Sequence, residues 1–282
     1  MASAVQPAYA AVKVLQYNED GTVKGVTSGK KESGPGSGSN KKAGQGFQPS
    51  ARFAEGELLV VNPSRYFEVN AKPLGFSIVE RSDFSQLKLS LIRLRTPSKY
   101  TVPQAQAFLK KKFPRINIAA NHLYDITGLP EDSAPIELAA LATSPASCGR
   151  GVRIGMIDSA VNTKHPALKG QKIKNRRFAA KGTKPGPSIH GTAIAGLFVG
   201  KMAKQGLGGY LPAAEIRAAN VQEISPSRKI VARASSILKA IDWLAKEKVH
   251  VINFNVSGAD NSALKAAVDR AHKKGLIQGK WT

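Results

Sequence analysis

The strongest constraint on the fold is an alternation of apolar runs and amphipathic stretches that begins at Gly151. The apolar runs lie at 152–157, 215–221 and 249–256, and helical stretches are predicted at 190–200, 235–248 and 262–274, with Gly275 as the C-cap of the last. Strands that are apolar throughout are buried on both faces, as in parallel sheets that carry helices on each side. The pattern therefore predicts an α/β fold.

The preceding region has shorter elements and predicts a small α+β unit. Strands are expected at 57–61, 76–80, 89–94 and 116–124, and helices around 63–74 and 102–109, with Thr101 as the N-cap of the second. This β-α-β-β-α-β order is that of a ferredoxin-like module. The Gly/Ser/Lys-rich start of the chain has too little apolar area to offset its ordering entropy. The predicted divisions are a flexible arm or signal remnant at 1–52, the small unit at 53–125, a linker at 126–148 and the α/β domain at 149–282.

Composition bears on the binding partners of the chain and excludes an intramolecular disulfide and a membrane helix. The net charge of +23 and the pI near 10.2 favour attraction to polyanions, although aromatics are only 6% and are not interleaved with the basic clusters. Cys148 is the single cysteine, so no intramolecular disulfide can form. No run approaches the roughly 18 apolar residues of a membrane helix. Ala8-Tyr9-Ala10 has the small-x-small form of a signal cleavage site, which predicts a secreted or periplasmic protein; a plain N-terminal arm is the alternative.

Two residues point to hydrolytic chemistry. Asp158 ends the apolar run at 152–157, and His190 opens a stretch of small residues typical of a tightly packed helix. Reactive groups of α/β sheets gather at the carboxyl ends of strands, and a carboxylate that orients an imidazole is two thirds of a hydrolytic triad. The five histidines are scattered without ligand spacing, so neither a metal nor another cofactor is expected.

The motifs around these residues resemble those of a known family. Gly151 to Ser159, followed by His165 to Leu168, resembles the aspartate motif of the subtilisin-like serine peptidases, and His190 to Gly196 resembles their histidine motif; 212–218 and 251–258 are similar to two later strands of that family, in the same order. The resemblance implies a serine endopeptidase in which Asp158 orients His190, the general base. It also implies that the backbone of Asn255, Val256, Ser257 and Gly258 binds an extended peptide substrate.

The small unit resembles the propeptides of the same family, with Gly56 to Val60 at its start and Asn121 to Tyr124 at its end. The resemblance implies a zymogen in which this unit packs on its own catalytic domain and blocks the cleft until it is cleaved. An unrelated α+β domain is the alternative.

Several positions depart from the family pattern. Ser159-Ala160 and Asn255 replace more usual residues, and the loop expected at 169–184 is basic without an acid, which argues against a calcium site. The chain ends before the segments that would supply the nucleophilic serine and the oxyanion asparagine, and neither Ser188 nor Ser257 fits the nucleophile motif. The resemblance therefore predicts a C-terminally truncated catalytic domain that is inactive by itself.

Two other functions stay open at this point. One is a noncatalytic inhibitor or binding protein that uses the propeptide-like unit. The other is a polyanion binder that uses Lys30-Lys31, Lys41-Lys42 and the basic residues at 169–184; nucleic acid is not favoured, because no recognition helix or zinc spacing is visible.

Overall fold

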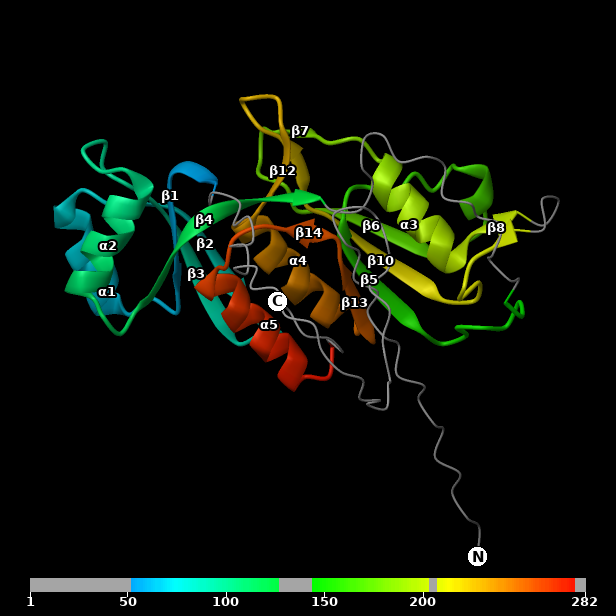
Figure 1. Ribbon diagram of the computed structural model, residues 1–282. Coiled ribbons are helices and arrows are strands. Elements are labelled where there is room, and N and C mark those ends of the chain that lie inside the picture. Colours follow the sequence, from blue (N-terminus) through cyan, green and yellow to red (C-terminus); the bar gives the residue numbers. More distant parts are fainter. Residues whose placement is uncertain (1–51, 127–143, 203–206, 277–282) are drawn as a thin grey trace, which may run out of the picture.

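The computed structural model describes residues 52–126, 144–202 and 207–276. These residues form an N-terminal module (residues 52–126) and a C-terminal segment (residues 144–276), which lie side by side in Figure 1. Residues 1–51 of the predicted arm (1–52), residues 127–143 of the predicted linker (126–148) and the last residues, 277–282, lie outside the described residues. The mixed α/β class predicted from the sequence is confirmed.

The N-terminal module has the predicted β-α-β-β-α-β order. Its elements are β1 (Phe53–Val61), α1 (Arg65–Ala71), a 3-10 turn (Lys72–Leu74), β2 (Ser77–Phe84), β3 (Leu89–Arg95), α2 (Val102–Lys112) and β4 (Asn117–Ile126). The strands pair antiparallel in the order β2-β3-β1-β4. Thr101 caps α2 in a reciprocal capping box with Gln104, as its place before Pro103 predicted.

The C-terminal segment is built around a parallel sheet. Its principal elements are β5 (Arg153–Asp158), β6 (Ile173–Arg177), α3 (Ile189–Val199), β10 (Glu215–Asn220), α4 (Ala234–Lys246), β13 (Val251–Phe254) and α5 (Ser262–Lys273). Strands β13-β5-β10-β6 pair in parallel in that order, with α3 packed on one face and α4 and α5 on the other. Gly275 follows α5 with a φ of +75° and donates its N–H to the carbonyl of His272, which confirms the predicted helix end.

Shorter elements complete the segment. They are a 3-10 turn (Pro166–Leu168), β7 (Lys184–Pro185), β8 (Lys201–Met202), β9 (Leu207–Gly208), β11 (Gln222–Ile224), β12 (Ile230–Arg233) and β14 (Val256–Ser257). The hairpin of β11 and β12 was not predicted, because its strands are short and interrupted by a polar turn. The strand predicted at 249–256 is divided at Asn255 into β13 and β14.

The stretch at 169–184 is basic as predicted, but it is not a loop throughout. Residues 173–177 form β6, an edge strand that pairs in parallel with β10. Lys172 pairs with Glu215 and Lys174 with Glu247, so two cations of this stretch are already neutralised. The high local charge obscured a strand whose edge position keeps most of its side chains in solvent.

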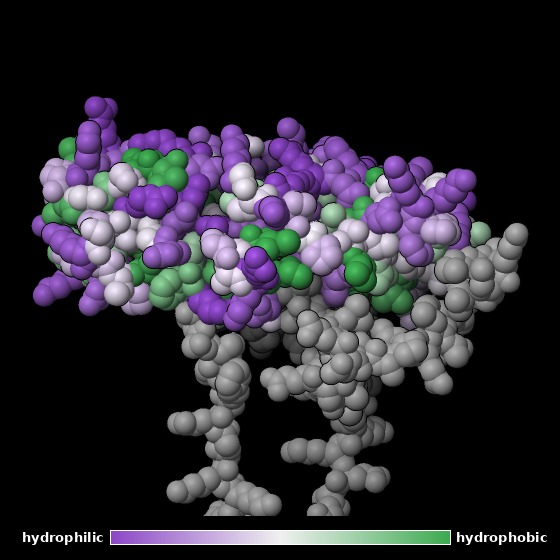
Figure 2. Space-filling view, turned by 90° about the horizontal axis from the view of Figure 1, so that it is seen from above, coloured by the Kyte–Doolittle hydropathy of each residue, from purple (hydrophilic) through white to green (hydrophobic). Residues whose placement is uncertain are grey.

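The module and the segment share one hydrophobic core. Alternate residues of β1 point to opposite faces, so Leu58 and Val60 face α1 and α2, whereas Leu59 and Val61 face the C-terminal segment. There they join buried residues of α4 and α5, among them Ile241 and Leu264. Figure 2 shows one face of the molecule, on which hydrophilic residues surround small hydrophobic patches. In the described part of the chain, no helix has the length and apolar character needed to cross a bilayer.

Candidate active site

A hydrogen-bonded aspartate and histidine form the centre of the candidate site. Asp158 is the last residue of β5 and is fully buried, and His190 is the second residue of α3. The Nδ1 atom of His190 lies 2.8 Å from Oδ1 and 2.9 Å from Oδ2 of Asp158. This arrangement leaves Nε2 as the imidazole atom that can exchange a proton with a reacting group.

Close packing at the start of α3 brings the two residues together. The amide of Gly191 donates to Oγ of Ser159 at 2.7 Å, and Ser159 donates its own amide to Oδ1 of Asp158 at 2.5 Å. A Cβ atom at Gly191 would lie 2.8 Å from the carbonyl oxygens of Ser159 and Ala160. Only glycine lets the helix approach β5 closely enough for His190 to reach Asp158.

The side chain of Asn255 makes a contact that the sequence did not indicate. Its side-chain Nδ2 donates to Oδ2 of Asp158 at 2.7 Å, so the carboxylate receives hydrogen bonds from three directions. Its backbone amide donates to the carbonyl of Ile157 at 3.2 Å. Asn255 thus supports the aspartate, and the contacts with an extended strand begin at the next residue.

The predicted substrate-binding residues flank a strand of the N-terminal module. The end of β4 pairs with two strands of the C-terminal segment: Leu123 and Tyr124 lie opposite Arg233 and Ala232 of β12, and Asp125 and Ile126 lie opposite Ser257 and Val256 of β14. We call the place where the end of β4 pairs with β12 and β14 the strand groove. In Figure 1, β4 runs from the module into the segment. The pairing of β12 with β4 was not predicted; the short apolar run at 230–232 was the available signal.

Tyr124 anchors the end of β4 in the strand groove. It is 1% exposed, and its hydroxyl donates to the carbonyl of Ala259 at 2.8 Å. Burial raises the pKa of the phenol well above its usual value. A Cβ atom at Gly258 would lie 2.7 Å from the ring, so the turn after β14 needs glycine to admit the tyrosine.

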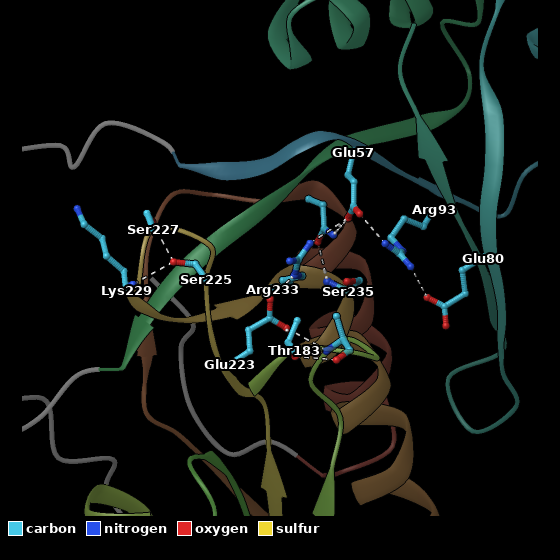
Figure 3. Close-up of polar contacts among 12 residues, drawn as sticks. Glu57, Glu80, Arg93, Thr183, Glu223, Ser225, Ser227, Lys229, Arg233 and Ser235 are labelled. Carbon is cyan, nitrogen blue, oxygen red and sulfur yellow. Dashed lines mark hydrogen bonds and ion pairs between the residues drawn. The ribbon is translucent and has the colours of Figure 1, made fainter. Parts of the chain in front are cut away.

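A buried ionic network joins the module to the segment beside the strand groove (Figure 3). Glu57 of β1 accepts from Arg93 at 2.5 Å, from Asn121 at 2.7 Å and from Arg233 at 3.4 Å. Arg233 also pairs with the buried Glu223 at 2.6 Å. No sequence signal identified this network, because its members are dispersed and become neighbours only when the two parts pack.

In the described residues, no serine hydroxyl forms a hydrogen bond with the imidazole of His190. There, the Nε2 atom is buried and has no hydrogen-bond partner. Ser188 precedes α3 and accepts hydrogen bonds from Thr192 through its carbonyl, whereas Ser257 pairs with β4. The described ranges also contain no group of three or more histidine, cysteine or acidic residues placed to hold a metal ion.

His122 lies at the junction between β4 and α5. Its Nδ1 lies 2.9 Å from Nδ2 of Asn261, the N-cap of α5, and desolvation lowers the pKa of the imidazole. A depressed histidine pKa means that the unfolded chain binds the proton more tightly, so the stabilisation present above the unfolded pKa is lost as pH falls through the folded pKa.

We therefore expect the free energy of unfolding to fall as the pH is lowered from about 7 to about 5, and His122→Gln to reduce this slope. Urea unfolding across that range measures it. His272→Gln removes an exposed imidazole and is the control. An unchanged slope in His122→Gln would contradict the assignment.

The fold and the site define an α/β domain in which a buried aspartate at a strand end is hydrogen-bonded to a histidine at a helix start. Residues 149–278 match the model of the subtilase family. Subtilisin E of Bacillus subtilis (strain 168) is 30% identical over 132 residues, which cover 46% of this chain and 33% of the relative. The major intracellular serine protease of the same organism is 24% identical over 166 residues, or 57% of this chain and 51% of the relative.

The fold comparison extends beyond the matched segment. Fervidolysin from Fervidobacterium pennivorans, a keratinolytic enzyme related to subtilisin, superposes with a TM-score of 0.59 at 20% identity over 82% of this chain and 40% of its own. At this identity the likeness concerns the fold alone. The chain thus spans between a third and about half of the length of these relatives.

Proposed function

We propose that the chain is part of the precursor of a subtilisin-like serine endopeptidase. Asp158 orients His190 through Nδ1, and His190 acts as the general base that takes the proton of a serine nucleophile and later returns it to the leaving amine. Asn255 donates a further hydrogen bond to the same carboxylate. The contact between Asp158 and His190, within the segment that matches the family, carries the proposal.

The N-terminal module is proposed to be the propeptide. Support comes from the end of β4, which pairs with β12 and β14, the strands with which an extended peptide substrate would pair. In this arrangement a substrate enters the strand groove only after β4 has left it. Export of the precursor remains a proposal, since the supporting residues 1–10 lie outside the described residues.

We expect the purified 282-residue chain not to react with a fluorophosphonate probe, because in the described residues no serine hydroxyl bonds to Nε2 of His190. A chimera that joins residues 1–278 to the following part of subtilisin E should be labelled. In that chimera, Asp158→Asn should lower kcat by about 10⁴-fold, as expected when the orienting carboxylate is lost.

The control for the chimera is Asp260→Asn, a change outside the Asp158–His190 contact. A chimera that unfolds cooperatively but is neither labelled nor active would contradict the proposed roles. Labelling of the 282-residue chain itself would contradict the expected inactivity.

The occupied strand groove also supports a second function, inhibition of a related peptidase in trans. A fragment covering residues 52–126 would then inhibit subtilisin E at micromolar concentration, whereas the fragment with Tyr124→Ala would be weaker. Absence of inhibition by a folded fragment would exclude this function.

A further inference from the structure

A second concave site lies at the other end of the contact between the module and the segment. It is a groove of about 360 Å³ between the ends of β1 and β3, the start of β4 and one face of α5. Asn62, Arg115 and Asn117 line it from the module, and Asp269, Arg270 and Lys273 line it from α5. The spacing of Asp269, Arg270 and Lys273 places their side chains on one face of α5. The groove is separate from the Asp158–His190 contact and from the strand groove.

The described lining of this groove carries more positive than negative charge. In the described part of the chain, Arg115, Arg270 and Lys273 have no ion-pair partner, and Asp269 is already paired with Lys265 at 2.9 Å. Elsewhere along the same contact, Arg93, Arg233 and Lys239 each have a carboxylate partner. Cations gathered in a concave site focus a positive potential and attract anions.

The polar groups beside these cations suit an oxyanion. Oδ1 of Asn62 accepts from the amide of Ser90, which leaves its side-chain NH₂ as a donor, and Asn117 is fixed by two hydrogen bonds with Ser262. Two guanidinium groups and an ammonium group supply the directional donors that recognise phosphoryl oxygens. The volume lies at the small end of the range of about 300–1,000 Å³ for ligand sites.

We propose that this groove binds a small ligand with two or more phosphoryl groups. The phosphoryl groups lie between Arg115 of the module and Arg270 and Lys273 of α5. Such a ligand bridges the two parts of the chain and strengthens the hold of the module on the segment by binding the associated state.

Isothermal titration of the 282-residue chain with tripolyphosphate at constant ionic strength tests the site. Arg270→Gln/Lys273→Gln should weaken binding by about 100-fold, or about tenfold for each charged donor that is removed. Lys110→Gln/Lys111→Gln removes the same charge from exposed positions on α2 and should change the affinity less than about twofold. No binding to the wild type, or equal weakening in both double variants, overturns the proposal.

Two single variants test whether binding depends on the charge of the groove and whether the ligand contacts both the module and the segment. Asp269→Asn removes the carboxylate from the groove and should tighten binding, a gain that misfolding cannot mimic. Arg115→Gln, on the module, should weaken binding and reduce the rise in unfolding temperature that tripolyphosphate produces. If Arg115→Gln binds as tightly as the wild type, or Asp269→Asn binds no more tightly, the bridged site is overturned.

Discussion

Replacing Tyr124 by alanine is expected to lower the free energy of unfolding by about 3–5 kcal/mol, the usual cost of truncating a large buried aromatic side chain. Tyr124 is 1% exposed and belongs to the hydrophobic core that the module and the segment share. The substitution removes its ring from the strand groove and leaves the carbonyl of Ala259 without its donor. Urea unfolding of the 282-residue chain provides the measurement.

Two variants separate the contributions at this site. Tyr124→Phe keeps the ring and removes only the hydroxyl, so we expect it to cost about 1 kcal/mol. Tyr210 is 52% exposed, and Tyr210→Ala should change the stability by less than about 0.5 kcal/mol. Similar losses in Tyr124→Ala and Tyr210→Ala would show that the end of β4 is not anchored in the strand groove.

Glu57→Ala is expected to have the second largest effect on the free energy of unfolding. Glu57 is 6% exposed and supplies carboxylate oxygens to Arg93, Arg233 and Asn121. Removing one partner from a buried ion pair costs about 3–5 kcal/mol, and we expect about 3 kcal/mol, the lower end of this range. The reason is that Arg93 retains Glu80 and Arg233 retains Glu223 as partners.

Glu57→Gln is the informative companion, because it keeps the shape and one acceptor but removes the charge. The free energy of unfolding of Glu57→Gln should fall between that of the wild type and that of Glu57→Ala. Glu55→Ala removes an exposed carboxylate two residues away and should be close to neutral. Equal stability of Glu57→Ala and Glu55→Ala in urea would mean that the network in Figure 3 does not stabilise the contact between the two parts.

These predictions bear on the proposed precursor because both residues act where the module meets the segment. Tyr124 fixes the end of β4 in the strand groove, and Glu57 ties β1 to β12 through Arg233. A propeptide that has to be removed needs an interface that is specific while the chain is intact. Desolvated charges matched across the two parts provide that specificity, because a wrong register leaves a charge buried without a partner.

The sequence by itself determined the local elements and their order. The apolar run at 152–157, the capping residue Thr101 and Gly275 each act through neighbours in the chain, so periodicity and capping rules were sufficient to place them. The positions of Asp158 at a strand end and His190 at a helix start followed from the same patterns. Parallel topology then required the two residues to lie near the same edge of the sheet.

Only the tertiary structure decided which distant residues share an environment. Three kinds of contact join residues that are 97 to 176 positions apart in the chain. They are the hydrogen bond from Asn255 to Asp158, the pairing of β4 with β12 and β14, and the contact of Glu57 with Arg233. The strand within 169–184 was missed for the same reason, since its pairing with β10 outweighs its polar composition. Such contacts depend on packing between the two parts of the chain, and local sequence patterns do not encode that packing.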